Sequence, residues 1–184
     1  MAIFRTSQPD SAADPALPHI VLVGLPGCGK TTVGSLLAKR LGRSFLDFDH
    51  EIARREGMTI AEIFAQHGEH RFRQIEADLT KELVEFGNMV LAPGGGWMAI
   101  GENVDLLRPQ SRIVYLRSSP AAALKRMGSK VSGRPLLMRP NPLGELQRML
   151  ELRKAAYEKA DRTVDVDRLD PQRVVDKVVG VLAS

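Results

Sequence analysis

A glycine-rich segment, GLPGCGKT at residues 24–31, constrains this chain more than any other feature. It fits the pattern G-x-x-x-x-G-K-[ST], and it lies between an apolar run at 19–24 and apolar residues at helical spacing over 30–41. A glycine loop that joins a strand to a helix presents successive backbone N–H groups, and the helix N-terminus adds about half a positive charge. We therefore interpret the segment as a loop that binds a chain of phosphates, and not as a chance glycine turn.

The residue types in this loop suit phosphate binding. Glycines let the backbone approach a ligand without a Cβ in the way. Lys30 can reach the β and γ phosphates, and the Thr31 hydroxyl can ligate Mg²⁺. Cys28 fits as a small residue in the loop, with a redox role for its thiol as the alternative. The amides expected to face the phosphates are those of Gly27, Cys28, Gly29, Lys30, Thr31 and Thr32.

Short apolar strands alternate with helices along the chain. Strands are predicted at 19–24, 44–49, 88–92, 112–116 and 163–166. Helices are predicted at 30–41, 59–66 and 71–86, and another begins at Pro120. A helix of about 16 residues follows the segment 128–142 and ends at Ala160, and a last one runs from Asp170-Pro171 to Leu182. This alternation predicts an α/β fold with a parallel sheet covered by helices on both faces.

The chain has the length and composition of one folded domain. Its 184 residues are 43% hydrophobic and 26% charged, which excludes a disordered or collagen-like chain. We expect residues 1–18 to be a flexible leader and 19–184 to form a single domain. Residues 128–142 carry prolines, glycines and basic side chains without a period, as expected of a lid.

Charge and hydropathy limit the possible partners. The net charge of +4 favours anionic ligands but is well short of that of a nucleic-acid binder. The single cysteine cannot form an internal disulfide, and no apolar run approaches the roughly 20 residues that span a bilayer. The first 18 residues lack the apolar region of a signal peptide. We therefore expect a cytoplasmic protein without membrane or nucleic-acid partners.

Two acids follow the second predicted strand. Asp47 and Asp49 are two residues apart, so both side chains should leave the same face at the carboxyl end of the strand, where open α/β sheets bind ligands. One carboxylate could serve a metal and the other a substrate hydroxyl. The alternative is that Asp49 only caps the helix that follows.

A second glycine run and three arginines are further candidates. The run follows the strand at 88–92 and would let a ligand lie against bare backbone, or it is a plain turn. The arginines are either anion-binding groups or solvated surface charges. These residues are Gly94, Gly95 and Gly96, and Arg73, Arg134 and Arg153.

Together these motifs resemble the shikimate kinase family over nearly all of residues 19–182. GLPGCGKTTVG is similar to its ATP loop, FLDFD to its paired-aspartate strand, and PGGG to the glycine motif that replaces a Walker B aspartate. IAEIFAQHGEHRFRQIE resembles the family's I-x-E-I-F…G-E-x-x-F-R-x-x-E stretch. GRPLL resembles its lid, and LRKAAYEKADRTVDV its R-x-x-x-Y-x-x-x-A-D…V-D ending.

The resemblance implies a fold and an activity. The fold is a three-layer α/β/α arrangement with a five-stranded parallel sheet, a P-loop NTPase of the nucleoside monophosphate kinase type. The activity is phosphorylation of the 3-hydroxyl of shikimate with ATP and Mg²⁺, in aromatic amino-acid biosynthesis. The implied partner is this small-molecule substrate, and the implied state is a monomer.

The resemblance also implies a role for each matched residue. Lys30, Asp49 and Arg134 would be catalytic, and Thr31 and Asp47 would hold Mg²⁺. Residues 27–32 would bind ATP, with further contacts from Arg126, Arg134 and Pro171. Shikimate would be bound by Asp49, Arg73, Gly94, Gly95, Gly96 and Arg153. Trp97-Met98 is bulkier than the usual pair after the glycines, so we expect a different pocket rim.

Three other functions stay in view. A kinase of gluconate or another small metabolite shares the ATP loop, but it would not need the D-x-D, F-R and GGG motifs together. A non-catalytic sensor that resembles shikimate kinase should lack part of the catalytic set and carry a DNA-binding domain. A nucleic-acid-dependent ATPase should show a basic surface interleaved with aromatic residues.

Overall fold

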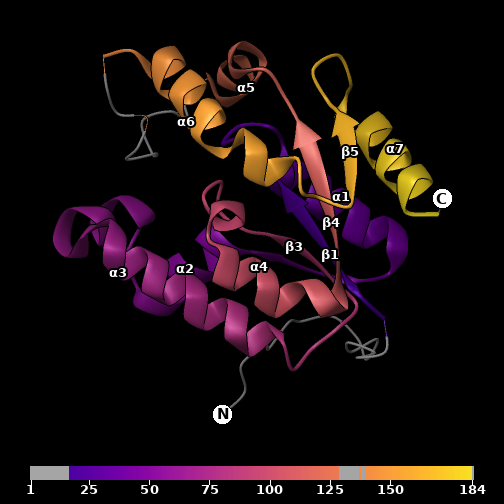
Figure 1. Cartoon of the computed structure of the whole chain (residues 1–184), viewed down its shortest axis with the longest axis horizontal. Coiled ribbons are helices and arrows are strands. Elements are labelled where there is room, and N and C mark those ends of the chain that lie inside the picture. Colours follow the sequence, from indigo (N-terminus) through magenta and orange to yellow (C-terminus); the bar gives the residue numbers. More distant parts are fainter. Residues whose placement is uncertain (1–16, 129–136, 138–139, 184) are drawn as a thin grey trace.

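The computed structural model describes residues 17–128, 137 and 140–183, and it shows a parallel sheet of five strands between layers of helices (Figure 1). The strands lie side by side in the order β2-β3-β1-β4-β5, and every neighbouring pair is parallel. The predicted α/β fold is therefore confirmed. The strands are β1 (His19–Val23), β2 (Ser44–Asp47), β3 (Met89–Ala92), β4 (Ser111–Arg117) and β5 (Arg162–Asp165).

The central strand β1 is buried along its whole length. Its side chains alternate, so that Ile20 and Leu22 pack into one apolar layer and Val21 and Val23 into the other. A strand covered on both faces needs apolar residues at every position, which explains the continuous apolar run. The first layer lies under α1 (Lys30–Leu41) and α7 (Pro171–Ala183).

The other helices cover the opposite face and the carboxyl edge of the sheet. Figure 1 shows α2, α3 and α4 grouped together, and α5 and α6 to the left of the arrowheads of β4 and β5. These helices are α2 (Phe48–Glu56), α3 (Ile60–Leu83), α4 (Gly101–Leu107), α5 (Pro120–Met127) and α6 (Pro142–Tyr157), with 3-10 turns η1 (Trp97–Ala99) and η2 (Arg108–Gln110). Because all strands are parallel, the loops after β1, β2 and β3 meet at one edge.

Some element boundaries differ from the prediction. The strand predicted over 44–49 ends at Asp47, because the Asp47 carboxylate accepts a hydrogen bond from the His50 amide (3.2 Å) and so caps α2. The helices predicted at 59–66 and 71–86 lie within the element α3, but the backbone angles of Gly68 (φ 77°, ψ 172°) are not helical, so α3 consists of two helical segments joined by a kink, in agreement with the two predicted helices. The short helix α4 was not predicted.

Two predicted segments fall mainly outside the described residues. Of the leader predicted over 1–18, the structure describes Leu17 and Pro18. Of the lid predicted over 128–142, it describes Gly128, Leu137 and 140–142. Within the described ranges, no helix is both long and apolar enough to cross a membrane.

Candidate functional site

A cleft of about 460 Å³ opens at the carboxyl edge of the sheet. Its walls come from the loop after β1, the ends of β2 and β3, helix α5 and the segment between β5 and α7. It brings most of the predicted site residues together. The lining residues are Gly27, Cys28, Gly29, Lys30, Thr31, Thr32, Val33, Asp47, Asp49, Ala92, Pro93, Gly94, Gly95, Arg126, Met127, Val166, Leu169, Pro171 and Val174.

The glycine loop after β1 has a shape that only glycine permits. Gly24 and Gly27 have φ values of 143° and 81°, which L side chains rarely adopt. A Cβ would stand 2.6 Å from the Leu116 carbonyl oxygen at Gly24, and 2.5 Å from the Ala123 carbonyl oxygen at Gly27. The main chain of the loop is therefore fixed against β4 and α5, and residues 27–32 line the cleft at the start of α1.

Lys30 and Thr31 lie at the first turn of α1, and each contacts a neighbouring acceptor. The Lys30 ammonium donates to the carbonyl oxygens of Gly24 (2.9 Å) and Leu25 (3.1 Å), which keeps it over the loop. The Thr31 hydroxyl donates to Asp47 Oδ2 (2.5 Å). Hydroxyl and carboxylate oxygens are hard donors of the kind that Mg²⁺ prefers, so this pair fits a magnesium ion that keeps most of its water.

Asp49 lines the cleft as predicted, but from a different element. It lies in the first turn of α2 and not on the strand, and the helix cap is Asp47, so the alternative role of Asp49 as the cap is wrong. Asp47 and Asp49 thus have separate surroundings. Asp47 faces Thr31, whereas Asp49 Oδ1 lies 3.5 Å from where a Cβ on Gly94 would stand.

Three consecutive glycines after β3 each leave room for side chains from elsewhere. Gly96 lies against Arg73 on α3, where a Cβ would stand 2.6 Å from Arg73 Nη2. Arg73 also donates from Nη1 to Glu76 Oε2 (2.8 Å) and from Nη2 to Glu69 Oε1 (2.9 Å). Only 20% of the Arg73 side chain is exposed, so Arg73 is fixed by these two carboxylates and is not a solvated surface charge.

Gly94 makes room for carboxylates. A Cβ there would stand 2.8 Å from Glu76 Oε1. Glu76 is fully buried, and burial raises the pKa of its carboxyl; Arg73 opposes the rise, and the Asp49 charge adds to it. Glu76 therefore supports Arg73 from inside the protein. Glu76 lies within a motif quoted for the resemblance, but no role was predicted for it. The signal in the sequence was an acid three residues after Arg73 in an apolar helix face.

Gly95 is contacted from α6. A Cβ there would stand 3.4 Å from Arg153 Nη1, and the Gly95 carbonyl accepts a hydrogen bond from the Tyr157 hydroxyl (2.5 Å). Burial raises the pKa of that hydroxyl well above its ordinary value, so it stays a donor. The structure thus brings Arg73 and Arg153, from two helices far apart in the sequence, to one glycine loop.

Beside the phosphate loop, one wall of the cleft is apolar except for the Arg126 guanidinium. Val166, Leu169 and Pro171 come from the segment around the end of β5, and Arg126 comes from α5. Arg126 and Pro171, which the resemblance assigns to ATP, therefore both line the same cleft as the phosphate loop. Arg134 lies outside the described residues.

The expectation for the pocket rim is wrong. Trp97 and Met98 are buried and belong to the core under α3, and neither lines the cleft. The Trp97 indole donates to the Thr80 hydroxyl (2.9 Å), which satisfies its one polar group inside the core.

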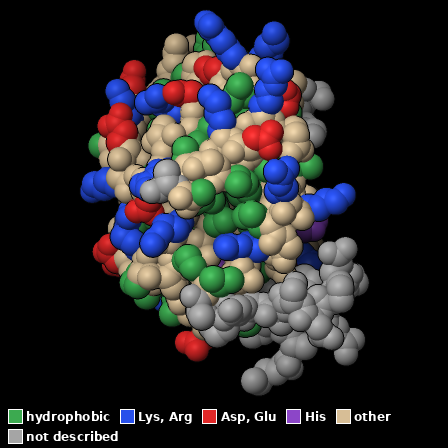
Figure 2. All heavy atoms as spheres, turned by 90° about the vertical axis from the view of Figure 1, so that its right-hand side faces the viewer, with side chains coloured by type: hydrophobic (Ala, Val, Ile, Leu, Met, Phe, Trp, Pro, Cys, Tyr) green, Lys and Arg blue, Asp and Glu red, His purple; other side chains and the backbone are tan. Residues whose placement is uncertain are grey.

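Surface charge is mixed on the face that Figure 2 shows. Lys and Arg side chains lie among Asp and Glu side chains, with hydrophobic groups between them, and they do not gather into one track on this face. That mixture does not resemble the continuous basic groove of a nucleic-acid binder.

Known proteins resemble this chain over almost all of its length. A family model described as shikimate kinase matches residues 26–183. A shikimate kinase of Psychrobacter sp. is 42% identical over 90% of this chain and 92% of its own. One from Thermodesulfovibrio yellowstonii is 39% identical over 89% of this chain and 94% of its own.

Solved structures also resemble this chain over almost all of its length. Shikimate kinase from Acinetobacter baumannii, solved in complex with shikimate, is 38% identical and has a TM-score of 0.87 over 92% of this chain and 94% of its own. A gluconokinase from Sinorhizobium meliloti has a TM-score of 0.59 at 19% identity over 90% of this chain and 91% of its own. The second likeness shows the fold alone.

Proposed function

This chain belongs to the shikimate kinase family, and we propose that it transfers the γ-phosphoryl group of ATP to the 3-hydroxyl of shikimate, giving shikimate 3-phosphate and ADP. The reaction serves aromatic amino-acid biosynthesis. The observation that carries this proposal is the cleft itself, because the phosphate loop and the loop flanked by Arg73 and Arg153 face one space of about 460 Å³. A phosphate donor and a small organic anion can meet there.

The phosphate loop would bind the donor. Its amides and the N-terminus of α1 would hold the ATP phosphates, and Lys30 would turn from the carbonyls of Gly24 and Leu25 to the β and γ phosphates. Arg126 and Pro171 would flank the base. Arg134 would contact the moving phosphoryl group, as the resemblance implies.

Thr31 and Asp47 would hold Mg²⁺. Their oxygens already meet at 2.5 Å, which suits a shared hard cation. When bound, the ion neutralises charge on the β and γ phosphates. Asp47 would then exchange its hydrogen bond from Thr31 for the metal, either directly or through water.

The glycine loop and its arginines would bind the acceptor. Guanidinium groups bind carboxylates through planar pairs of donors, so Arg73 and Arg153 would hold the shikimate carboxylate at two points. Gly94 to Gly96 would let the ring lie against bare backbone, and Asp49 would accept hydrogen bonds from its hydroxyls.

Positioning and charge neutralisation would supply most of the catalysis. Phosphoryl transfer passes through a loose transition state with little covalent change for the protein to promote. Asp49 would orient the 3-hydroxyl and take its proton late in the transfer, so an ordinary carboxylate is basic enough. Lys30 and Arg134 would neutralise the charge on the transferring group.

We also propose that the protein acts as a monomer in the cytoplasm. Both substrates would lie within one cleft, and its described walls come from a single chain. The single cysteine is buried in the phosphate loop, which suits a compartment without disulfide chemistry.

An ADP-release assay with parallel acceptors tests the proposal. We expect ADP to form with shikimate at a rate far above that with gluconate or with no acceptor, and phosphorus NMR should place the phosphate on the 3-hydroxyl. Consumption of gluconate alone would transfer the assignment to a gluconate kinase. Shikimate binding without any turnover would point to a sensor.

A further inference from the structure

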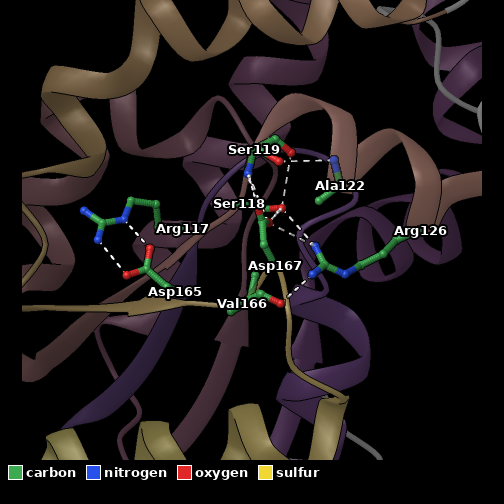
Figure 3. A network of polar contacts seen from close by, with 8 residues as sticks. All are labelled: Arg117, Ser118, Ser119, Ala122, Arg126, Asp165, Val166 and Asp167. Atoms are coloured by element: carbon green, nitrogen blue, oxygen red, sulfur yellow. Dashed lines mark hydrogen bonds and ion pairs between the residues drawn. The ribbon is translucent and has the colours of Figure 1, made fainter.

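A network of polar side chains supports Arg126 from behind the cleft (Figure 3). Arg126 donates from Nη1 to the Ser118 hydroxyl (2.9 Å) and from Nη2 to the Val166 carbonyl (2.5 Å). Ser118 follows β4, and Val166 follows β5, so the guanidinium joins the ends of two strands. About a third of the Arg126 side chain, 30%, stays exposed, and the residue lines the cleft.

The Ser118 hydroxyl links Arg126 to a carboxylate. It has one proton to donate, and it lies 2.7 Å from Asp167 Oδ1 but 3.3 Å from the Ser119 carbonyl. The shorter contact, to a charged acceptor, takes the proton. The oxygen of the hydroxyl is then free to accept from Arg126, so the direction of each hydrogen bond is fixed.

Asp167 is itself held at both oxygens. They accept from the Ser119 amide at 3.1 and 3.0 Å, beside the N-terminus of α5. Burial raises the pKa of Asp167, but hydrogen bonds from Ser118 and Ser119 and the charge of Arg126 lower it further, so its pKa lies below the ordinary value. The carboxylate is therefore charged at neutral pH, 3.8 Å from Arg126 Nη1.

We propose that Ser118 and Asp167 are positioning residues that hold the Arg126 guanidinium in place as one wall of the nucleotide-base subsite. This inference rests on the proposed kinase function, in which the ATP phosphates occupy the phosphate loop of the same cleft. A guanidinium plane stacks on a nucleobase. Holding it before binding removes the cost of ordering a flexible side chain, which corresponds to about two- to tenfold in affinity.

Calorimetric titration of the full chain with ADP, and separately with tripolyphosphate, tests this role. Ser118→Ala should raise the Kd for ADP about two- to tenfold. The Kd for tripolyphosphate should not change, because that ligand has no base and contacts the phosphate loop alone. The same loss for both ligands would overturn the proposal, because it would indicate general damage to the cleft.

Asp165→Asn is the matched control. Asp165 forms an ion pair with Arg117 in the same view of Figure 3 and lies two residues before Asp167, but its side chain is 66% exposed and does not line the cleft. This control should leave the Kd for both ligands unchanged. An increase in the ADP Kd as large as that of Ser118→Ala would contradict a specific role of Ser118.

A double-mutant cycle separates positioning from a direct effect. In an Arg126→Ala background, Ser118→Ala and Asp167→Ala should not raise the ADP Kd further, because the group that they position is gone. Additive losses would overturn the proposal. If the wild-type chain binds ADP and the Ser118→Ala variant has the same Kd for ADP, this inference alone is overturned. If the wild-type chain binds neither ADP nor tripolyphosphate, the proposed function is contradicted as well.

Discussion

The two ends of the cleft are built in different ways. At the phosphate loop, the shape comes from the main chain, because Gly24 and Gly27 adopt positive φ and touch carbonyls of β4 and α5. At the second glycine loop, side chains from α2, α3 and α6 create the site and hold one another in place. Substitutions of these side chains should therefore weaken the binding of shikimate selectively. At the phosphate loop, the charge of one side chain, Lys30, should instead affect the rate of phosphoryl transfer.

The largest expected effect is at Lys30. Lys30→Met should lower kcat by about a thousandfold or more, because it removes a positive charge from the transferring phosphoryl group. Shikimate binding, measured by titration, should be unchanged. The matched control is Lys39→Met, at the exposed last turn of the same helix, which should keep wild-type kcat. A Lys30 variant with kcat near wild type would refute the division between the two ends.

Arg73→Ala probes the acid end. It should raise the KM for shikimate about a hundredfold, because it removes a charge-assisted contact to a carboxylate, with less than about a twofold change in the KM for ATP. Arg71→Ala, two residues away on α3 in a long, partly exposed pair with Glu56 (3.8 Å), is the control and should change neither value. An unchanged KM for shikimate would show that the carboxylate binds elsewhere.

Gly96→Ala tests whether backbone space positions Arg73. The added Cβ would stand 2.6 Å from Arg73 Nη2, so the guanidinium must shift, and the KM for shikimate should rise about tenfold. Gly101→Ala adds the same methyl group where nothing lies within 4 Å, and it should be silent in the same steady-state assay. Equal behaviour of the two variants would contradict the packing of Arg73 on the glycine loop.

The smallest effect is expected from Glu76→Gln. This nearly isosteric change removes the charge that holds Arg73, and the KM for shikimate should rise about threefold at neutral pH. Because burial raises the pKa of Glu76, the wild-type carboxyl takes up its proton at a higher pH than an ordinary glutamate as the pH falls, and it then resembles glutamine. The ratio of the two KM values should therefore approach one at acidic pH. A ratio that is constant with pH would exclude the charge as the cause.

The sequence predicted the phosphate end better than the acid end for a physical reason. Glycine positions and the flanking strand and helix are local signals, and they specify the loop at 24–31 within a few residues. The strands were found for the same reason, since a buried parallel strand is a continuous apolar run. Only the end of β2 was misplaced, because the cap hydrogen bond from the His50 amide to the Asp47 carboxylate leaves no hydrophobic signal.

Features made by distant residues were not predictable in this way. Ser118 and Asp167 meet although 49 residues separate them along the chain. Trp97 was expected at the rim because its size alone was visible, whereas the Thr80 hydroxyl that accepts its N–H lies on another element. Glu76 had a usable spacing from Arg73, but its importance depends on complete burial, which the sequence does not display.

A crystal structure of the chain with ADP and shikimate tests the central claim most directly. We expect the ADP phosphates on the amides of residues 27–32 and the shikimate carboxylate within hydrogen-bonding distance of both Arg73 and Arg153, with the ring against Gly95. A carboxylate bound away from both arginines, or a nucleotide outside the phosphate loop, would contradict the account.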